Sequence, residues 1–202
     1  MSTTAAQWAA QTMSIAQQRL ELAADNLANL STHGFRRRDA EVQRFSGALR
    51  LAARTVQDQG AIRPTGNRFD LALAGHGAFA LQTAQGAVIH SRDGAFSRTE
   101  DGRLLDERGR ALMGRCGVLH VGAQAVIDAD GTVREGERVV DLLALPHGTT
   151  VRQGAIEVSG VEATHELLAI LRAQRSFESG QRIVAADDEM HRKAIDDVAQ
   201  VR

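Results

Sequence analysis

The residues of this chain that could do chemistry are few and stand apart from one another. The run Asp128–Gly131 begins like a calcium-binding loop, but its glycine is fourth rather than sixth, and its twelfth position is Val139 rather than glutamate. His165 precedes Glu166, yet no second histidine follows four residues after the first, so the zinc-protease pattern is not met. We interpret Asp128–Gly131 as a hairpin turn.

Candidate nucleophiles and bases also lack partners. His76 lies between two glycines, as in a tight turn, and a hydrolase built on His76 and Asp70 would need a nucleophile that the sequence does not indicate. Cys116 is the single cysteine, so an intramolecular disulfide is impossible and a structural thiol is favoured. No phosphate-binding, dinucleotide-binding or serine-hydrolase motif occurs. We predict a protein that is not an enzyme, with no cofactor and no metal site.

The composition fits one or two globular domains. The 202 residues are 43% hydrophobic and 24% charged, with a net charge of −1, six Phe, one Trp and no Tyr. This balance disfavours a nucleic-acid binder and a protein held on membranes by charge. The basic run Arg36–Arg38 is offset by Asp39 and Glu41, which favours a solvated or interface-facing segment.

Targeting signals are missing from the N-terminus. The first residues lack the basic region, the long apolar region and the cleavage site of a secretory signal. No run approaches the roughly 18 apolar residues of a membrane span. We therefore expect neither Sec-dependent export nor insertion into a membrane.

The C-terminal stretch, residues 161–201, has the heptad pattern of a long helix that buries a narrow seam. Leu167 and Ile195 occupy the partner position of this heptad, and Gly180 is the one weak helix former. Thirty-six helical residues would extend roughly 54 Å, so we expect the helix to need a partner. The principal heptad position holds Ala163, Ile170, Phe177, Val184 and Val198, with His191 interrupting the series.

The partner is expected at the other end of the chain, where residues 5–30 predict a helix. This helix should end among residues 29–34, with Gly34 at positive φ. The first row of its heptad seam is Met13, Ala16, Leu20, Ala23, Leu27 and Leu30, and a second row is Trp8, Ile15 and Leu22. The two rows either face one core or contact more than one neighbour. We expect Met13, Leu20 and Leu27 to pack on Ile170, Phe177 and Val184, in a register that the sequence does not fix.

The middle of the chain changes character at Gly60. Residues 39–58 carry a weak helical pattern, whereas later residues alternate short apolar segments with turn dipeptides, which indicates an antiparallel β-domain. The predicted strands are 69–74, 78–83, 87–91, 96–98, 104–105, 118–121, 126–127, 133 and 139–145.

The predicted fold class is therefore α+β. Long N- and C-terminal helices pair as a coiled coil, and a small all-β domain is inserted between them. The predicted domains are an N-terminal helix at 1–34, a connecting segment at 35–59, a β-rich domain at 60–158 and a C-terminal helix at 159–202.

Three stretches resemble the axial proteins of the bacterial flagellum, in particular basal-body rod proteins of the FlgF/FlgG type. Residues 23–36 resemble the family's N-terminal signature, in which an Asn-Leu-Ala-Asn helix end runs into a Thr-x-Gly-Phe-basic turn. Residues 65–79, together with 91–97 and 101–104, resemble its central series, and residues 160–190 resemble its C-terminal helix. In this sequence the signature turn includes Asn26, Asn29, Gly34 and Phe35.

This resemblance implies a structural subunit of the flagellar rod. Its helices would form an inner coiled coil that stacks with other rod subunits, or with further copies of itself, around a hollow tube. Export would use the flagellar type III apparatus, without a cleaved signal peptide. The stretch between Leu145 and Gln153 is shorter than in the family, and so is the segment after Phe35, which favours a FlgF-like identity over FlgG. A β-domain binding module that dimerises through a helical stalk is the alternative.

Overall fold

The computed structural model describes residues 5–45 and 48–200, without the side chains of residues 45, 48 and 194–200. Within this part of the chain there are two helices, α1 (Ala5–Ala28) and α2 (Ala163–Gln200). By their contacts the elements form two compact units. The helical unit contains residues 1–28, 38–56 and 161–202, and the β-rich unit contains residues 29–37 and 57–160. The predicted connecting segment at 35–59 is therefore divided between them.

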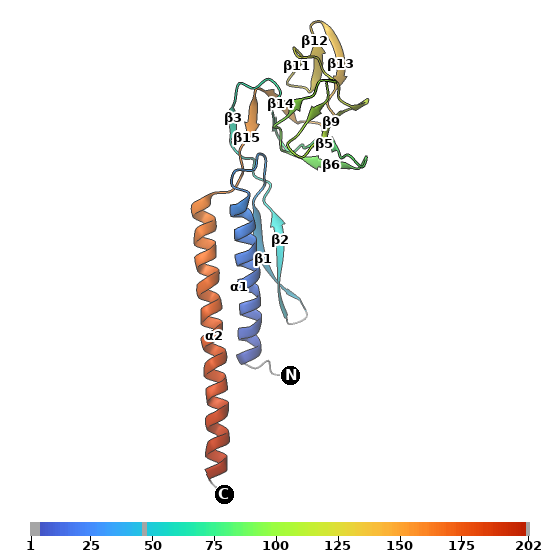
Figure 1. Cartoon of the computed structure of the whole chain (residues 1–202). Helices are drawn as coiled ribbons and strands as arrows, with labels where there is room; N and C mark the ends of the chain where they lie inside the picture. The colour runs from blue at the N-terminus through green and yellow to red at the C-terminus, as the bar shows by residue number, and fades with distance from the viewer. Residues whose placement is uncertain (1–4, 46–47, 201–202) are drawn as a thin grey trace. The chain divides into compact units, whose positions relative to one another are not determined.

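In the helical unit, α1 and α2 lie side by side and run in opposite directions (Figure 1). The most buried residues of α1 include three alanines spaced seven apart, Ala9, Ala16 and Ala23, each at most 3% exposed. On α2, Ala173 is equally buried, and Gly180 is buried one heptad further on. Small residues of this kind allow two helix backbones to approach closely.

The two helices are antiparallel, which settles the direction of pairing that the sequence left open. Asn26 near the end of α1 hydrogen-bonds Glu166 near the start of α2, and a Cβ added to Gly180 would overlap Met13. Leu27 therefore lies at the start of α2. Val184 is 18 residues after Glu166 in the sequence, or roughly 27 Å along the helix.

Two strands, and not the predicted helix, occupy most of the described residues between 39 and 58. Strands β1 (Arg38–Phe45) and β2 (Ala48–Thr55) make an antiparallel hairpin that lies beside α1 (Figure 1). One face pairs Val42 with Leu51, and the other pairs Asp39 with Arg54. The helix-like spacing of Val42 and Leu49 arises from two strands, whose apolar side chains meet on one face of the ribbon.

The β-rich unit is built from short antiparallel strands, as its turn spacing predicted. Its sheets have the orders β6-β5-β9-β8-β7 with β10 on β9, β11-β12-β13, β14-β4 and β15-β3. The strands are β3 (Ile62–Pro64), β4 (Leu71–Ala74), β5 (Phe79–Gln82), β6 (Val88–Ser91), β7 (Ser97–Arg98), β8 (Leu104–Leu105), β9 (Ala111–Gly114), β10 (Gly117–Val118), β11 (Val126–Ile127), β12 (Thr132–Glu135), β13 (Arg138–Leu142), β14 (Thr150–Gln153) and β15 (Ala155–Glu157).

The core of this unit is aliphatic around one aromatic pair. Phe79 and Phe96 meet edge to face with ring centroids 5.4 Å apart, and Leu71, Leu73 and Leu81 are fully buried nearby. The unit closes on itself because β14 pairs with β4 and β15 pairs with β3, so the last two strands join the first two.

The predicted turns are confirmed in two places. The Gly131 N–H donates to the Asp128 carbonyl at 2.9 Å in the turn between β11 and β12, which is the hairpin turn expected of this run. Helix α1 ends at Ala28, and Gly34 has a φ of +64° in the loop that follows, also as expected.

Candidate assembly surface and polar node

The predicted seam residues are only partly buried by contacts within the chain. Ile15 is buried, and it lines a groove with Leu49 and Leu51 of β2, so the hairpin is the second neighbour of α1. Trp8 and Leu167 are exposed by 38% and 49%. The remaining described seam residues are half-buried: Met13, Leu20, Leu22, Leu27, Ile170, Phe177 and Val184. Ile195 and Val198 belong to α2, but their side chains lie outside the described residues.

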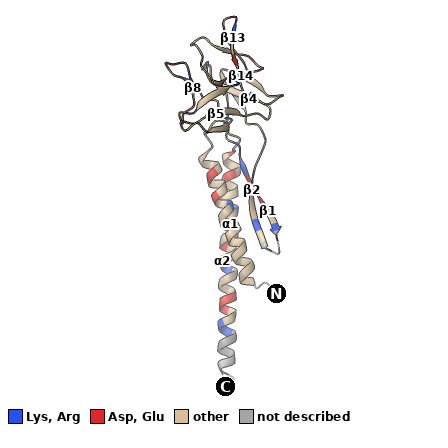
Figure 2. Ribbon diagram, turned by 90° about the vertical axis from the view of Figure 1, so that its right-hand side faces the viewer, with Lys and Arg blue, Asp and Glu red and all other residues tan. Residues whose placement is uncertain are grey.

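Apolar side chains remain exposed on both flanks of the helix pair. On one flank, Leu20 and Phe177 line a shallow groove with neighbouring polar side chains. On the other, Trp8 and Ile183 border a second groove, and both are exposed. Figure 2 shows that charged residues along α2 alternate with uncharged stretches of the ribbon. These flanks are the candidate assembly surface.

Asn26, a residue of the signature, joins three elements of the helical unit. Its side-chain oxygen accepts from the Arg38 N–H at 3.0 Å, and its nitrogen donates to the Arg38 carbonyl at 2.7 Å. The same nitrogen donates to Glu166 at 3.1 Å, and both side chains are almost fully buried. Asn26 therefore holds the first residue of β1 and the start of α2 against the end of α1.

The rest of the signature forms a turn in the β-rich unit. Asn29 accepts from the N–H and the hydroxyl of Thr32, and Phe35 donates to the Thr32 carbonyl. Gly34 is buried, and a Cβ there would overlap the Arg92 carbonyl oxygen. Glycine is therefore required at this position both by its positive φ and by the closeness of the neighbouring backbone.

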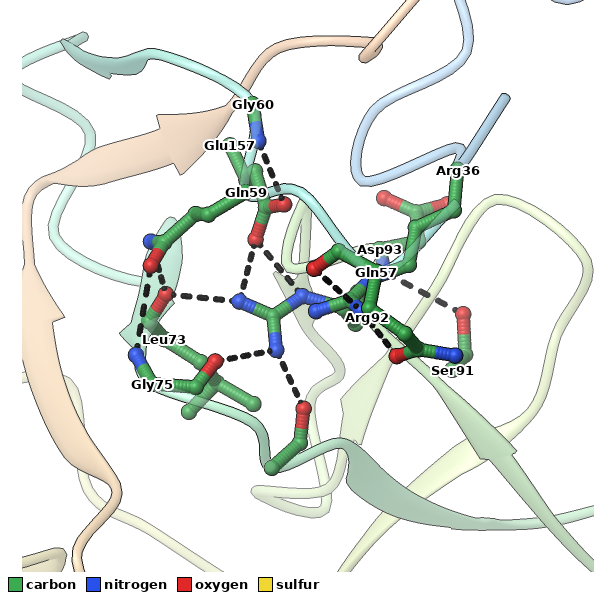
Figure 3. A network of polar contacts seen from close by, with 11 residues as sticks. Arg36, Gln57, Gln59, Gly60, Leu73, Gly75, Ser91, Arg92, Asp93 and Glu157 are labelled. Atoms are coloured by element: carbon green, nitrogen blue, oxygen red, sulfur yellow. Dashed lines mark hydrogen bonds and ion pairs between the residues drawn. The ribbon is translucent and has the colours of Figure 1, made fainter. Parts of the chain in front are cut away.

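Arg92 lies at the centre of a buried polar network, the Arg92 node (Figure 3). Its Nε and Nη2 contact Glu157 at 2.7 and 2.6 Å, and Nη2 also donates to the Leu73 carbonyl. Nη1 donates to the carbonyls of Gly75 and Gly77. Each of the five N–H donors of a guanidinium thus has an acceptor, which a lysine could not reproduce.

Glu157 hydrogen-bonds two segments that are distant in sequence, the loop after α1 and the segment before β3. Its Oε1 accepts from the Gly60 N–H at 3.1 Å, and its backbone carbonyl accepts from the Gly34 N–H at 2.8 Å. Gly160 in turn donates to the Phe35 carbonyl at 2.8 Å. The three stretches that resemble the flagellar family therefore meet at or beside this node. Gly34 comes from the first stretch, Arg92 from the second and Gly160 from the third.

Two further charges border the node. Arg36 donates to the carbonyl of Gln57 at 2.8 Å. The pKa of Arg36 is lowered, mainly by burial and secondly by the positive charge of Arg92. His33 lies 3.9 Å from Asp93, whose pKa is raised by burial.

Among the residues considered for catalysis, Asp70 has a structural role. Asp70 accepts from Thr65 at 2.6 Å and from Asn67 at 2.9 Å, whereas His76 is exposed. Cys116 is exposed, and its hydrogen bond to Asp141 raises the pKa of the thiol. In the described part of the chain, no group of three His, Cys, Asp or Glu side chains could hold a metal ion. Among the same residues, no helix is long and apolar enough to cross a membrane.

Sequence reasoning did not identify Arg92 and Glu157 as important residues. Arg92 belongs to a quoted family stretch, but its acceptors come from residues 73–77 and from Glu157, which is 65 residues away. One local feature could have indicated the role of Glu157. It is a charged residue at the end of a short strand whose other two residues are apolar and buried. A lone charge in such a strand indicates a buried partner elsewhere.

Three family models match successive parts of the chain. "Flagella basal body rod protein" matches residues 7–36, "Flagellar hook protein FlgE/F/G D1 domain" matches 72–135, and "Flagellar basal body rod FlgEFG protein C-terminal" matches 152–197. Together they cover more than half of the chain. Their ranges include Gly34, Arg92 and Glu157.

Whole-chain relatives carry the same names. The chain is 25% identical to the flagellar basal-body rod protein FlgG of Agrobacterium fabrum, over 90% of this chain and 94% of the relative. It is 27% identical to FlgF of Mesorhizobium japonicum, over 81% and 84%. A hook protein FlgE of Brucella abortus is 35% identical over 48% of this chain. The FlgG alignment spans 247 positions, more than the 202 residues present here, so that relative has segments that this chain lacks.

Proposed function

Because the chain belongs to the flagellar basal-body rod proteins of the FlgF/FlgG type, we propose that its paired helices are the element that assembles it into the rod. The protein is a structural subunit of the flagellar basal body. Its partners are other rod subunits and further copies of itself, and we propose no catalytic role for it. Relatives of both names match, so a FlgF-like position in the rod stays a prediction.

One observation carries the assembly role. The helical unit leaves apolar side chains exposed on both flanks of the pair, including Trp8 and Ile183 on one side. A monomeric soluble protein would cover such a surface or replace it with polar residues. We propose that neighbouring subunits cover it in a coiled-coil-like, non-closing helical array. Passage through the flagellar type III apparatus is part of the same proposal.

The test is complementation of a strain that lacks this chain. The full chain should restore swimming and complete basal bodies, whereas a chain lacking residues 163–202 should restore neither, because α1 then has no partner. The matched control is Cys116→Ser, which changes an exposed side chain and should rescue fully. Intact basal bodies and normal swimming in the deletion strain would rule the proposal out. The binding-module alternative predicts a closed dimer of the full chain, which sedimentation would detect.

A further inference from the structure

The β-rich unit consists of a set of local hairpins and a segment that closes on them from the far end of its sequence. We name residues 71–143 the hairpin body and residues 150–160, which contain β14 and β15, the strap. In the body most strands pair with the next strand along the chain, as β5 does with β6 and β11 with β12. The strap pairs with β4 and β3 instead, and its pairs Ala74 with Thr150 and Ile62 with Glu157 are 76 and 95 residues apart in sequence.

The hairpin body holds nearly all of the hydrophobic core. Of the described residues in the core cluster, Val151 is the one that belongs to the strap, and all the others lie in the body. The aromatic pair Phe79 and Phe96 is also part of the body. Apolar burial is the main favourable term in folding, so the body keeps most of its stabilisation when the strap is away.

The strap is held by a continuous run of backbone hydrogen bonds. In addition to the ladders of β14 and β15, the Val151 N–H donates to the Ala129 carbonyl at 2.9 Å. The Gly154 N–H donates to the Asp70 carbonyl at 2.8 Å. Contiguous strand contacts of this kind open and close cooperatively, which makes the strap a candidate for a separate unit of stability.

The strap also joins the two chain segments that lead to the helices. The Glu157 carbonyl accepts from the N–H of Gly34, which follows α1 in sequence, at 2.8 Å. The N–H of Gly160, which precedes α2, donates to the Phe35 carbonyl at 2.8 Å. Among the described strands, β3 pairs with β15 alone, and the two lie side by side (Figure 1). The loop after α1 and the segment before α2 are therefore connected through the strap.

We propose that the strap opens and closes on the hairpin body as one unit, and that its closure joins the loop after α1 to the segment that enters α2. In the open form the body stays folded, whereas the ladders of β14 and β15 and the hydrogen bonds of Gly34 and Gly160 are broken. The segments that lead to the two helices are then free of each other. This inference goes beyond the proposed function and does not rest on it.

Native-state hydrogen exchange of the full chain, followed by NMR, tests whether the strap opens separately. Body amides should exchange only when the whole β-rich unit unfolds, whereas strap amides should exchange whenever the strap opens. The strap amides should therefore share one protection factor, at least about tenfold below that of the body. The strap reporters are the amides of Gly34, Val151, Gly154, Val158 and Gly160, and the body reporters are those of Leu119 and Leu143.

The urea dependence of exchange distinguishes opening of the strap from unfolding of the whole unit. The slope of the opening free energy against urea concentration grows with the surface that is exposed on opening. Because the strap is a short segment, its amides should show at most about half the slope of the body amides. Equal slopes would show that strap and body unfold together, which would overturn the inference.

Two matched valine substitutions sharpen the test. Val151 lies in the strap and Val121 in the body, and each is 3% exposed. Val121→Ala destabilises the closed and the open form alike, so it should lower the protection of the body amides about tenfold and leave the strap amides unchanged. Val151→Ala destabilises the closed form alone, so it should lower the protection of both sets about tenfold. Loss of strap protection in Val121→Ala would contradict a separate opening.

The remaining outcomes also decide the matter. Strap amides whose protection factors differ from one another by more than about tenfold would show separate fraying contacts instead of one closing unit. If a valine variant does not fold, the protection factors and urea slopes of the wild type decide alone. A deletion strain that swims normally refutes the proposed function but does not bear on the strap, so the two failures are distinguishable.

Discussion

The two units of this protein differ in how far their side chains find partners within the same chain. The β-rich unit pairs its buried charges, with each Arg92 donor matched and Glu157 accepting from both side chain and backbone. The helical unit buries small residues in its seam and leaves Leu168, Leu171 and Ile183 about half exposed. The first unit satisfies the groups of the Arg92 node internally, whereas the second presents apolar surface that a further molecule can cover. Substitutions in the two units should therefore produce different phenotypes.

The largest effect is expected at the Arg92 node. Glu157→Ala leaves a buried guanidinium without its counter-charge, which typically costs about 3–5 kcal/mol. The unfolding midpoint in urea should fall accordingly, together with swimming. The matched control is Asp101→Ala, which breaks the exposed Arg103 pair and should leave the midpoint near that of the wild type. Equal effects of the two substitutions would contradict the role given to burial.

The next effect is expected at the signature turn. Gly34→Ala places a Cβ at positive φ and against the Arg92 carbonyl oxygen. Gly86→Ala also has a positive φ, but a Cβ there meets open space, so it measures the backbone cost alone, about 1 kcal/mol. We expect Gly34→Ala to cost at least about 2 kcal/mol in denaturant unfolding, since overpacking adds its own cost. If the two variants proved equally stable, the close approach would be unimportant.

A smaller effect on stability, but a clear one on assembly, is expected in the helix seam. Gly180→Leu must displace Met13 and should cost about 1–3 kcal/mol of helix pairing. The helical far-UV circular dichroism signal of the variant should be lost at a lower temperature than that of the wild type, and the variant should rescue swimming poorly. Gln181→Leu adds the same side chain at the next, exposed position and should behave like the wild type. A Gly180→Leu chain that rescues fully would show that the seam tolerates a wider separation.

The smallest effect concerns pH. Burial raises the pKa of Asp93 above its usual 3.8, so its contribution to stability is complete below that pH and is lost as pH rises through the folded-state pKa. Asp93→Asn removes the titration and keeps an oxygen for the Ala95 N–H. The variant should gain stability relative to the wild type as pH rises from about 3.8 towards neutral, as thermal melts would show. A constant difference across that range would argue against the shift.

The sequence indicated the helices and the β-rich region better than it indicated how they pack. Heptad spacing locates a helix but does not fix its direction, so the sequence left the pairing register open, and the structure places Met13 against Gly180. Of the most buried row, Ala16 and Ala23 belong to the predicted first row of the seam, whereas Ala9 was not included in it. Whether the pair is a coiled coil stays a prediction.

Missed strands have a common physical cause. Strand β1 contains Val42, which pairs with Leu51 of β2, so the apolar face exists only when the two strands are paired. Strand β9 at 111–114 and strand β14 at 150–153 are each four residues long and pair with β5 and β4, far away in sequence. Segments this short carry too few residues for a periodic signal.

The place of Glu157 near the end of the β-rich sequence has a consequence for the timing of folding. Its contacts with Gly34, Gly60 and Arg92 span from 65 to 123 residues, and loops of that length close slowly compared with local turns. If the chain emerged from a narrow conduit with its N-terminus first, Arg92 would lack its ion-pair partner until Glu157 had emerged. The late arrival of this carboxylate would then delay completion of the Arg92 node until nearly all of the β-rich unit had emerged.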